Sequence, residues 1–381
     1  MPTFEKIKWM PPTITLINTL VDLGYDITYI TIYPDEYYQN FDQHHVKNIS
    51  LCKKTFSLLD YCRDKKILSS IAYRIDVMIE KFLAHRLRNC LGNIVKPDDI
   101  LWVVNEMTVM YAGCRFLKSF DKYIFTMYEL HGNHFWERNI KKAAQNACIN
   151  IVPEYNRAHI QKCLYALNKT PVVLPNKPMN HPINRNMVLP NKEVFEKIQK
   201  CRDEGKKIIM YMGIISEERP LEPFIQAISE SGNKYQLMII GRESSYLNEL
   251  KNKYPTGFQY LGFFTPPDHL AVASHSDIGL LIYVDRNKNN GMNALFCAPN
   301  KIFEYTGFGM PVIANDIPGL HHVIKTAECG TCVDLNDKKS IIAGIETCIK
   351  NYEKYSNNAK KYFDSVEIPK IVASIIESYY A

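Results

Sequence analysis

The sequence predicts an α/β fold of two domains, each built from a parallel sheet covered by helices. The chain has 381 residues, enough for two domains of ordinary size. From about Lys206 onward, short β-type runs alternate with amphipathic helical stretches, which is typical of parallel sheets. The first half shows the same alternation less regularly. Between the halves, residues 174–206 carry four prolines and several asparagines, as a linker would.

The second half is the clearer of the two. Its expected strands are six short apolar runs, at 207–213, 235–241, 258–264, 278–284, 310–316 and 329–335. Helices are expected between them, at 221–229, 246–253, 267–274, 299–307 and 340–351. Six strands with intervening helices predict a Rossmann-like domain.

In the first half we expect a helix at 13–23 and a long amphipathic helix at 67–91. The strands expected there are 26–33, 99–106, 122–130, 147–153 and 171–176. An opening strand should precede Thr13, yet residues 1–12 contain no apolar run. Either that strand is short and irregular, or the chain starts downstream of it.

Composition limits the classes of protein. With 46% hydrophobic and 23% charged residues, the chain is not collagen-like, coiled-coil or disordered. No apolar run approaches the ~20 residues that span a bilayer, and the N-terminus lacks the apolar core of a secretory signal, so we expect a cytoplasmic protein. Residues 1–180 hold 23 Lys and Arg against 17 Asp and Glu, which accounts for the whole net charge of +6. This favours an acidic partner, such as an anionic membrane or a phosphorylated acceptor, or is the surface of a slightly basic domain.

The 11 cysteines include one closely spaced pair, Cys329 and Cys332. Structural zinc sites of this kind use two such pairs, and redox pairs normally open a helix. We therefore expect no metal site and reduced, mostly buried thiols.

The stretch APNKIFEYTGFGMPVIANDIPG, residues 298–319, carries the strongest chemical pattern. Asn300 opens a predicted helix, whose free N–H groups favour anions, and Lys301 adds a positive charge in its first turn. Glu304 lies one turn further on the same face, where a carboxylate could accept both hydroxyls of a ribose. An ordinary surface Lys–Glu pair is the competing interpretation.

This stretch resembles the nucleotide-sugar-binding segment of GT-B glycosyltransferases, in particular glycosyltransferase family 4. Segments 172–178, 211–228, 238–242 and 260–283 also fit their places in that family. The resemblance implies two Rossmann-like domains facing across a cleft: an acceptor domain at 1–176, a hinge at 177–206, a nucleotide-sugar domain at 207–366, and a terminal helix at 367–381 that crosses back to the first domain.

The resemblance also implies roles for single residues. Glu304 would bind the donor ribose, Lys301 and Arg219 would neutralise the diphosphate, and the main chain near Phe263 would hold the base. Arg242 could reach the base or the phosphates, or only cap the sheet. Asn300 and Gly213 complete the expected donor site, and Gly291 would let the loop 285–297 close over the sugar. No cofactor or metal is required, and a nucleoside-diphosphate sugar is the donor substrate.

Two positions depart from the family pattern. Phe296 replaces a second glutamate that many members carry eight residues before the ribose-binding one, and Ile214 replaces an arginine that usually follows the glycine of the first strand. These departures leave the donor sugar open.

On the acceptor side, YELHGNHFW follows a predicted strand. The resemblance favours His131 first and Glu129 second as groups that position or polarise the acceptor; a loop histidine with a structural role is the alternative. At 152–160, Glu154, Asn156 and Arg157 could line the cleft or simply start a helix. The basic helix 67–91 could rest on an anionic membrane, or pack with one solvated face.

The function that the resemblance implies is transfer of a sugar from a nucleoside-diphosphate sugar to a glycan or lipid-linked acceptor. It implies retention of anomeric configuration and a setting in bacterial surface polysaccharide synthesis, at most peripherally on the inner face of the membrane and without nucleic acid. Two alternatives remain: a catalytically silent GT-B subunit that binds nucleotide or a partner, and a GT-B-fold nucleotide-sugar epimerase.

Overall fold

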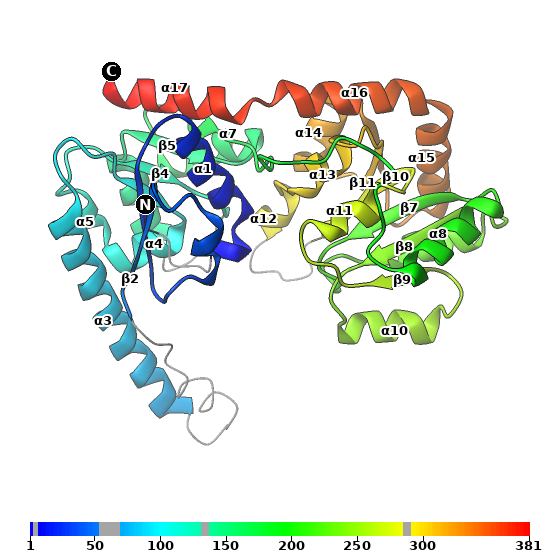
Figure 1. Ribbon diagram of the computed structural model, residues 1–381, viewed down its shortest axis with the longest axis horizontal. Coiled ribbons are helices and arrows are strands. Elements are labelled where there is room, and N and C mark those ends of the chain that lie inside the picture. The colour runs from blue at the N-terminus through cyan, green and yellow to red at the C-terminus, as the bar shows by residue number, and fades with distance from the viewer. Residues whose placement is uncertain (3–6, 53–68, 131–136, 285–290) are drawn as a thin grey trace. The chain divides into compact units, whose positions relative to one another are not determined.

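The computed structural model describes residues 1–2, 7–52, 69–130, 137–284 and 291–381 (Figure 1). The chain divides into two compact units, each with its own sheets. Unit 1 comprises Met1–Pro175 and Ile368–Ala381, and unit 2 comprises Asn176–Glu367.

Unit 2 contains a six-stranded sheet in which all neighbouring strands are parallel. Its strands are β7 (Lys207–Met212), β8 (Tyr235–Ile240), β9 (Gln259–Gly262), β10 (Ile278–Leu281), β11 (Val312–Asn315) and β12 (Gly330–Val333). Their order across the sheet is β12-β11-β10-β7-β8-β9. This is the Rossmann order, in which the chain direction across the sheet reverses between the first and fourth strands, here β7 and β10. Ligands of such sheets bind outside the carboxyl ends of the strands at that reversal.

Both faces of this sheet are buried, which explains why its strands are nearly continuous apolar runs. Alternate residues of β7 pack into two different cores: Met210 and Met212 into one, Ile209 and Tyr211 into the other. The helices of the unit are α8 (Lys192–Asp203), α9 (Glu222–Ser229), α10 (Ser245–Lys253), α11 (Asp268–Ala273), α12 (Gly291–Leu295), α13 (Lys301–Thr306), α14 (Pro318–Ala327), α15 (Lys338–Lys350) and α16 (Tyr352–Ser365).

Residues 177–206, expected to be a hinge, group with unit 2. The second half of this stretch forms α8, and Asn191 caps this helix by accepting the N–H of Val194 at 2.9 Å. The buried face of α8 packs Val194, Ile198 and Cys201 into the core that also holds Met210. The prolines of the stretch all precede this helix, so they do not interrupt it.

Unit 1 contains a four-stranded parallel sheet, β3 (Trp102–Val104), β4 (Ile124–Thr126), β5 (Ile149–Val152) and β6 (Val172–Val173), and a parallel pair, β1 (Ile27–Thr31) and β2 (Val46–Ser50). The first two residues of the chain lie between these sheets. The N–H of Ile30 donates to the carbonyl of Met1 at 2.9 Å, and the N–H of Val104 donates to that of Pro2 at 3.3 Å. Met1 and Pro2 thus bridge β1 and β3, and residues 3–6, where an opening strand would continue, lie outside the described residues.

The helices of unit 1 are α1 (Pro11–Asp22), α3 (Ser69–Ile94), α4 (Glu106–Ala112), α5 (Cys114–Leu117), α6 (Glu137–Asn146), α7 (Tyr155–Tyr165) and α17 (Ile368–Tyr380), with two 3-10 turns at Ile7–Trp9 and Glu36–Asn40. The terminal helix α17 groups with this unit and contacts α1. Lys122 fixes the end of α17 by donating from Nζ to the carbonyl of Tyr379 at 3.1 Å. Among the described residues, no helix is both long and apolar enough to cross a membrane.

Candidate functional site

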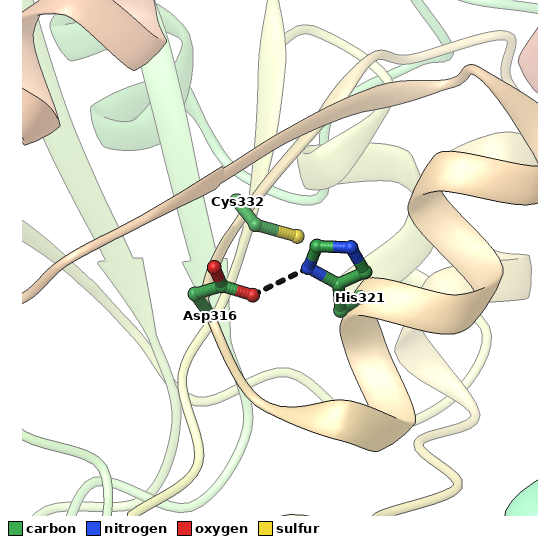
Figure 2. A group of neighbouring side chains, drawn as sticks. All are labelled: Asp316, His321 and Cys332. Carbon is green, nitrogen blue, oxygen red and sulfur yellow. Dashed lines mark hydrogen bonds and ion pairs between the residues drawn. The ribbon is translucent and has the colours of Figure 1, made fainter.

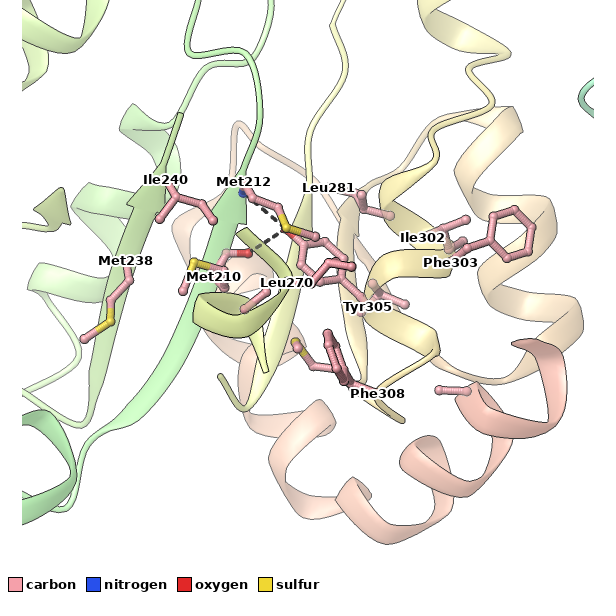
Figure 3. Close-up of a cluster of buried hydrophobic side chains, with 14 of the residues drawn as sticks. Met210, Met212, Met238, Ile240, Leu270, Leu281, Ile302, Phe303, Tyr305 and Phe308 are labelled. Carbon is pink, nitrogen blue, oxygen red and sulfur yellow. Dashed lines mark hydrogen bonds between the residues drawn. The ribbon is translucent and has the colours of Figure 1, made fainter. Parts of the chain in front are cut away.

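The helix α13 is fastened to the sheet of unit 2 by the side chain of Tyr305. Tyr305 is fully buried, and its hydroxyl donates to the carbonyl of Met210 at 3.0 Å and accepts the N–H of Met212 at 3.2 Å (Figure 3). Gly279 on β10 makes room for the ring, because a Cβ atom there would collide with it. This anchor holds α13 beside β7 and β10, where the sheet reverses direction.

Lys301, at the start of α13, lies over Gly213 at the carboxyl end of β7. A Cβ atom on Gly213 would collide with Cε and Nζ of Lys301, so any other residue there would require the end of the lysine side chain to shift. The backbone of Gly213 also has φ +130°, a conformation that favours glycine. The structure therefore brings together two residues of the expected donor site, Lys301 and Gly213.

Glu304, one turn after Lys301, is a largely buried carboxylate, with 19% of its side chain exposed. Burial alone would raise its pKa. The nearby imidazole of His269, with Nε2 3.7 Å from Oε1 of Glu304, and the charge of Lys301 outweigh burial and leave the pKa of Glu304 below its ordinary value. The carboxylate is therefore ionised at neutral pH and can accept hydrogen bonds from hydroxyl groups.

The sequence interpretation missed two histidines beside Glu304. His269 lies on α11, and His181 contacts the main chain of α13, with Nε2 2.9 Å from the carbonyl of Glu304. Gly307 leaves the space for the ring of His181, because a Cβ there would collide with it. Burial lowers the pKa of His181, which favours its neutral form.

Arg219 follows β7 in the chain and is held on the ring of Tyr283, with its guanidinium carbon 3.9 Å from the ring centroid. Asn315 at the end of β11 fixes Tyr283 by accepting its N–H at 3.0 Å and donating to its carbonyl at 2.8 Å. Burial raises the pKa of Tyr211 to about 12, and the charges of Lys301 and Arg219 both oppose that rise. Both cations therefore act on the same point near the end of β7.

The remaining expected donor-site residues are Asn300, Arg242, Phe263 and Gly291. Asn300 precedes α13 in a helical conformation, and its side chain makes no capping hydrogen bond; the helix has six residues. Arg242 lies on the ring of Phe263, 4.9 Å from its centroid, and Phe263 is 48% exposed. This pair could offer a flat surface to a base, although it lies at the ends of β8 and β9. Gly291 is the first residue of α12, and residues 285–290 of the expected sugar loop lie outside the described residues.

In unit 1, His131 and His134 lie outside the described residues, so their position is not described. Glu129 is exposed, and its N–H donates to Oε1 of Glu106 at 3.0 Å. Glu106 is a buried acid that the sequence interpretation missed. Burial raises the pKa of Glu106 to about 8, although the hydrogen bond from the N–H of Glu129 acts to lower it.

The segment 152–160 is a helix start, the second of the two alternatives for it. The side chain of Glu154 accepts the N–H of Arg157 at 2.9 Å and so caps α7. Nδ2 of Asn156 donates to Glu154 at 2.7 Å. The guanidinium of Arg157 is buried and donates to the carbonyl of Tyr128. These groups are occupied in holding α7.

Residues 193–362 match the family described as glycosyl transferases group 1. No curated protein sequence matches the chain. Among solved structures, sucrose-phosphate synthase from Thermosynechococcus elongatus has a TM-score of 0.66 at 13% identity, over 97% of this chain and 92% of that one.

Two further structures are similar over nearly the whole chain. HepE of Anabaena, solved in complex with UDP, has a TM-score of 0.65 at 14% identity, with 96% of this chain and 95% of that one covered. A glycosyltransferase from Rickettsia africae has a TM-score of 0.65 at 14% identity, with 100% and 96% covered. At such identities the likeness shows the fold alone. The chain thus has the GT-B fold, and residues 193–362, which carry Lys301 and Glu304, match the model of the glycosyl transferases group 1 family.

Proposed function

We propose that this protein transfers a sugar from a nucleoside-diphosphate sugar to a hydroxyl group of a glycan or lipid-linked acceptor. The observation that carries the proposal is the pairing of Lys301 and Glu304 on α13, with the lysine over Gly213 where the sheet reverses direction. A cation and an ionised carboxylate one helical turn apart match the diphosphate and the ribose of one nucleotide.

Each charged group has a separate task in this proposal. Glu304 accepts hydrogen bonds from the two ribose hydroxyls, which its lowered pKa permits at neutral pH. Lys301 and Arg219 lie against the diphosphate. Negative charge grows on the leaving diphosphate as the glycosidic bond breaks, so these cations stabilise the transition state more than the bound donor. They do so without a metal ion at the diphosphate.

HepE of Anabaena, one of the similar structures, is solved in complex with UDP and with UDP-glucose. This supports UDP-hexoses as the first donors to test here. The family segment supports a retaining reaction, in which a donor phosphate oxygen takes the acceptor proton and no protein nucleophile is needed.

The acceptor is expected on unit 1, where His131 and Glu129 would position it. The excess of positive charge in residues 1–180 supports an acidic acceptor or a peripheral contact with an anionic membrane, as in the assembly of bacterial surface polysaccharides.

The test is nucleotide binding and nucleotide release with the full chain. Titration calorimetry with UDP and GDP identifies the base, and release of nucleotide is then measured with the matching panel of donor sugars. Glu304→Ala should weaken binding strongly, whereas Glu328→Ala, which removes an exposed carboxylate paired with Lys354, should leave it unchanged. Equal affinity of Glu304→Ala and wild type would contradict the proposed ribose contact.

The same assay separates the alternatives. A catalytically silent subunit, which Phe296 in place of a glutamate favours, would bind nucleotide without releasing it from any donor. An epimerase would change the sugar without depending on an acceptor.

A further inference from the structure

Three potential metal ligands meet at the edge of the sheet in unit 2. Asp316 follows directly after β11, Cys332 lies on the neighbouring strand β12, and His321 lies in the first half of α14. Figure 2 shows the thiol of Cys332 and the carboxylate of Asp316 directed toward the ring of His321. One ligand atom of each residue lies within 4.8 Å of those of the other two.

The backbone, rather than the side-chain contact, brings these groups together. The N–H of Asp316 donates to the carbonyl of Val333 at 3.0 Å, and Ala314 pairs with Cys332 in the parallel ladder. The N–H of His321 donates to the carbonyl of Ile317 at 2.8 Å in the first turn of α14. The three side chains are therefore preorganised by two strands and a helix.

The chemistry of the set is that of a zinc ligand set: a thiol, an imidazole and a carboxylate. Oδ1 of Asp316 and Nδ1 of His321 already lie 2.6 Å apart, and both side chains are about half exposed, so an ion can reach them. The Sγ of Cys332 makes no hydrogen bond with any residue in the described part of the chain. Three protein ligands leave the fourth zinc position open.

The only closely spaced cysteine pair in the sequence is Cys329 with Cys332, which lacks the second pair of a structural zinc site. Cys329, however, is fully buried among apolar side chains such as Ile324, whereas Cys332 is only partly buried. A hydrogen-bonded aspartate and histidine alone are common on protein surfaces. The thiol that faces them from the next strand distinguishes this group.

We propose that Asp316, His321 and Cys332 bind one divalent metal ion of the zinc class. On binding, the thiol of Cys332 loses its proton to solvent, His321 binds through Nδ1 and keeps its proton on Nε2, and Asp316 supplies a carboxylate oxygen. The ion would join the carboxyl ends of β11 and β12. The site lies outside the groups assigned to sugar transfer, so it stands whether or not that activity is found.

The test is cobalt titration of the reduced, chelator-treated full chain. A cobalt–thiolate bond gives a charge-transfer absorption in the near ultraviolet, and we expect one ion per chain, displaced by zinc. Cys332→Ser should abolish this absorption, and His321→Ala should weaken cobalt binding by more than about 100-fold, beyond the 10–100-fold typical of outer-sphere changes.

Two matched variants serve as controls. His322→Ala removes the neighbouring imidazole on α14, and Cys163→Ser removes an exposed thiol of unit 1; both should keep the absorption. Circular dichroism checks that each variant folds. If Cys332→Ser does not fold, two other measurements test the site. Asp316→Asn should weaken cobalt binding, and zinc should raise the melting temperature of wild type but not of His321→Ala. An absorption that persists in Cys332→Ser, or no absorption in wild type, would overturn the proposal.

Discussion

Replacing Tyr305 by phenylalanine tests the anchor that places the donor-site helix. The substitution removes only the hydroxyl, so the ring keeps its packing on Gly279 and no cavity of methyl size forms. What is lost is the acceptor for the N–H of Met212 at 3.2 Å and a hydroxyl donor near the carbonyls of Met210 at 3.0 Å and Leu280 at 3.4 Å. Because these partners are buried, the N–H of Met212 is left without an acceptor.

The magnitude follows from that unsatisfied group. A buried donor that loses its partner costs about 1–3 kcal/mol, so we expect the free energy of unfolding to fall by that amount. Tyr355→Phe is the matched control, because Tyr355 packs on the other core of unit 2 and its hydroxyl makes no hydrogen bond with a described residue. That change should cost less than about 0.5 kcal/mol.

Urea unfolding of the full chain, followed by circular dichroism, measures both variants. Gly279→Ala adds a second test of the same contact, because the new Cβ must push the ring of Tyr305 and should cost about 1–3 kcal/mol. The double variant should lose less stability than the two single losses together, since the phenylalanine ring is free to move once its hydroxyl anchor is gone. A Tyr305→Phe protein as stable as the Tyr355→Phe protein would refute the reasoning.

The remaining predictions concern the proposed chemistry. Lys301→Ala and Arg219→Ala should each raise the activation free energy of turnover by about 2–4 kcal/mol, while donor affinity changes less. Steady-state kinetics and donor titration measure the two effects. Equal losses in turnover and in donor affinity would reject the transition-state role. His131→Ala should keep nucleotide affinity and reduce transfer, so a variant with wild-type transfer would remove His131 from the acceptor site. Because the folded pKa of Glu304 is lowered, its ionised form stabilises the fold above the unfolded pKa of about 4.5, and this contribution disappears as the pH falls through the folded pKa. The difference in unfolding free energy between wild type and Glu304→Gln should therefore shrink in acid, and a gap that stays constant down to about pH 3 would contradict this sign.

The parallel sheet of unit 2 could be predicted because its strands are buried on both faces. Continuous apolar runs such as 207–213 and 235–241, separated by helical stretches, are typical of a parallel sheet with helices on both sides. Helical spacing alone puts Lys301 and Glu304 on one face, but their expected role in donor binding came from the resemblance of the whole segment 298–319 to GT-B glycosyltransferases.

The missed helix α8 did carry a signal. Val194, Ile198 and Cys201 recur at helical spacing behind the capping Asn191. Prolines elsewhere in 174–206 led to the expectation of a linker, although none of them falls within α8. Local periodicity was the better guide there than average composition.

The histidines beside Glu304 had no such signal. His181 lies 123 residues before Glu304 and His269 lies 35 before it, and neither spacing corresponds to a helix or a strand. Their contacts exist only because α11 and the segment before α8 pack around α13. Spacing within one element can therefore predict a charge pair, but not the neighbours that set the pKa of its carboxylate.

The same reasoning explains why cysteine spacing could not reveal the proposed metal ligands. Cys329 and Cys332 are close in the sequence, but Cys329 precedes β12 and is fully buried, whereas Cys332 lies on the strand and is only partly buried. Asp316 and Cys332 are 16 residues apart and meet because β11 and β12 are parallel neighbours whose register pairs Ala314 with Cys332. In a parallel sheet, the carboxyl ends of all strands lie at the same edge, so residues that follow different strands can form one binding site there. This rule describes Gly213 after β7, Tyr283 after β10 and Asp316 after β11. The residues that follow each strand are therefore a better guide to binding groups than cysteines that are close in the sequence.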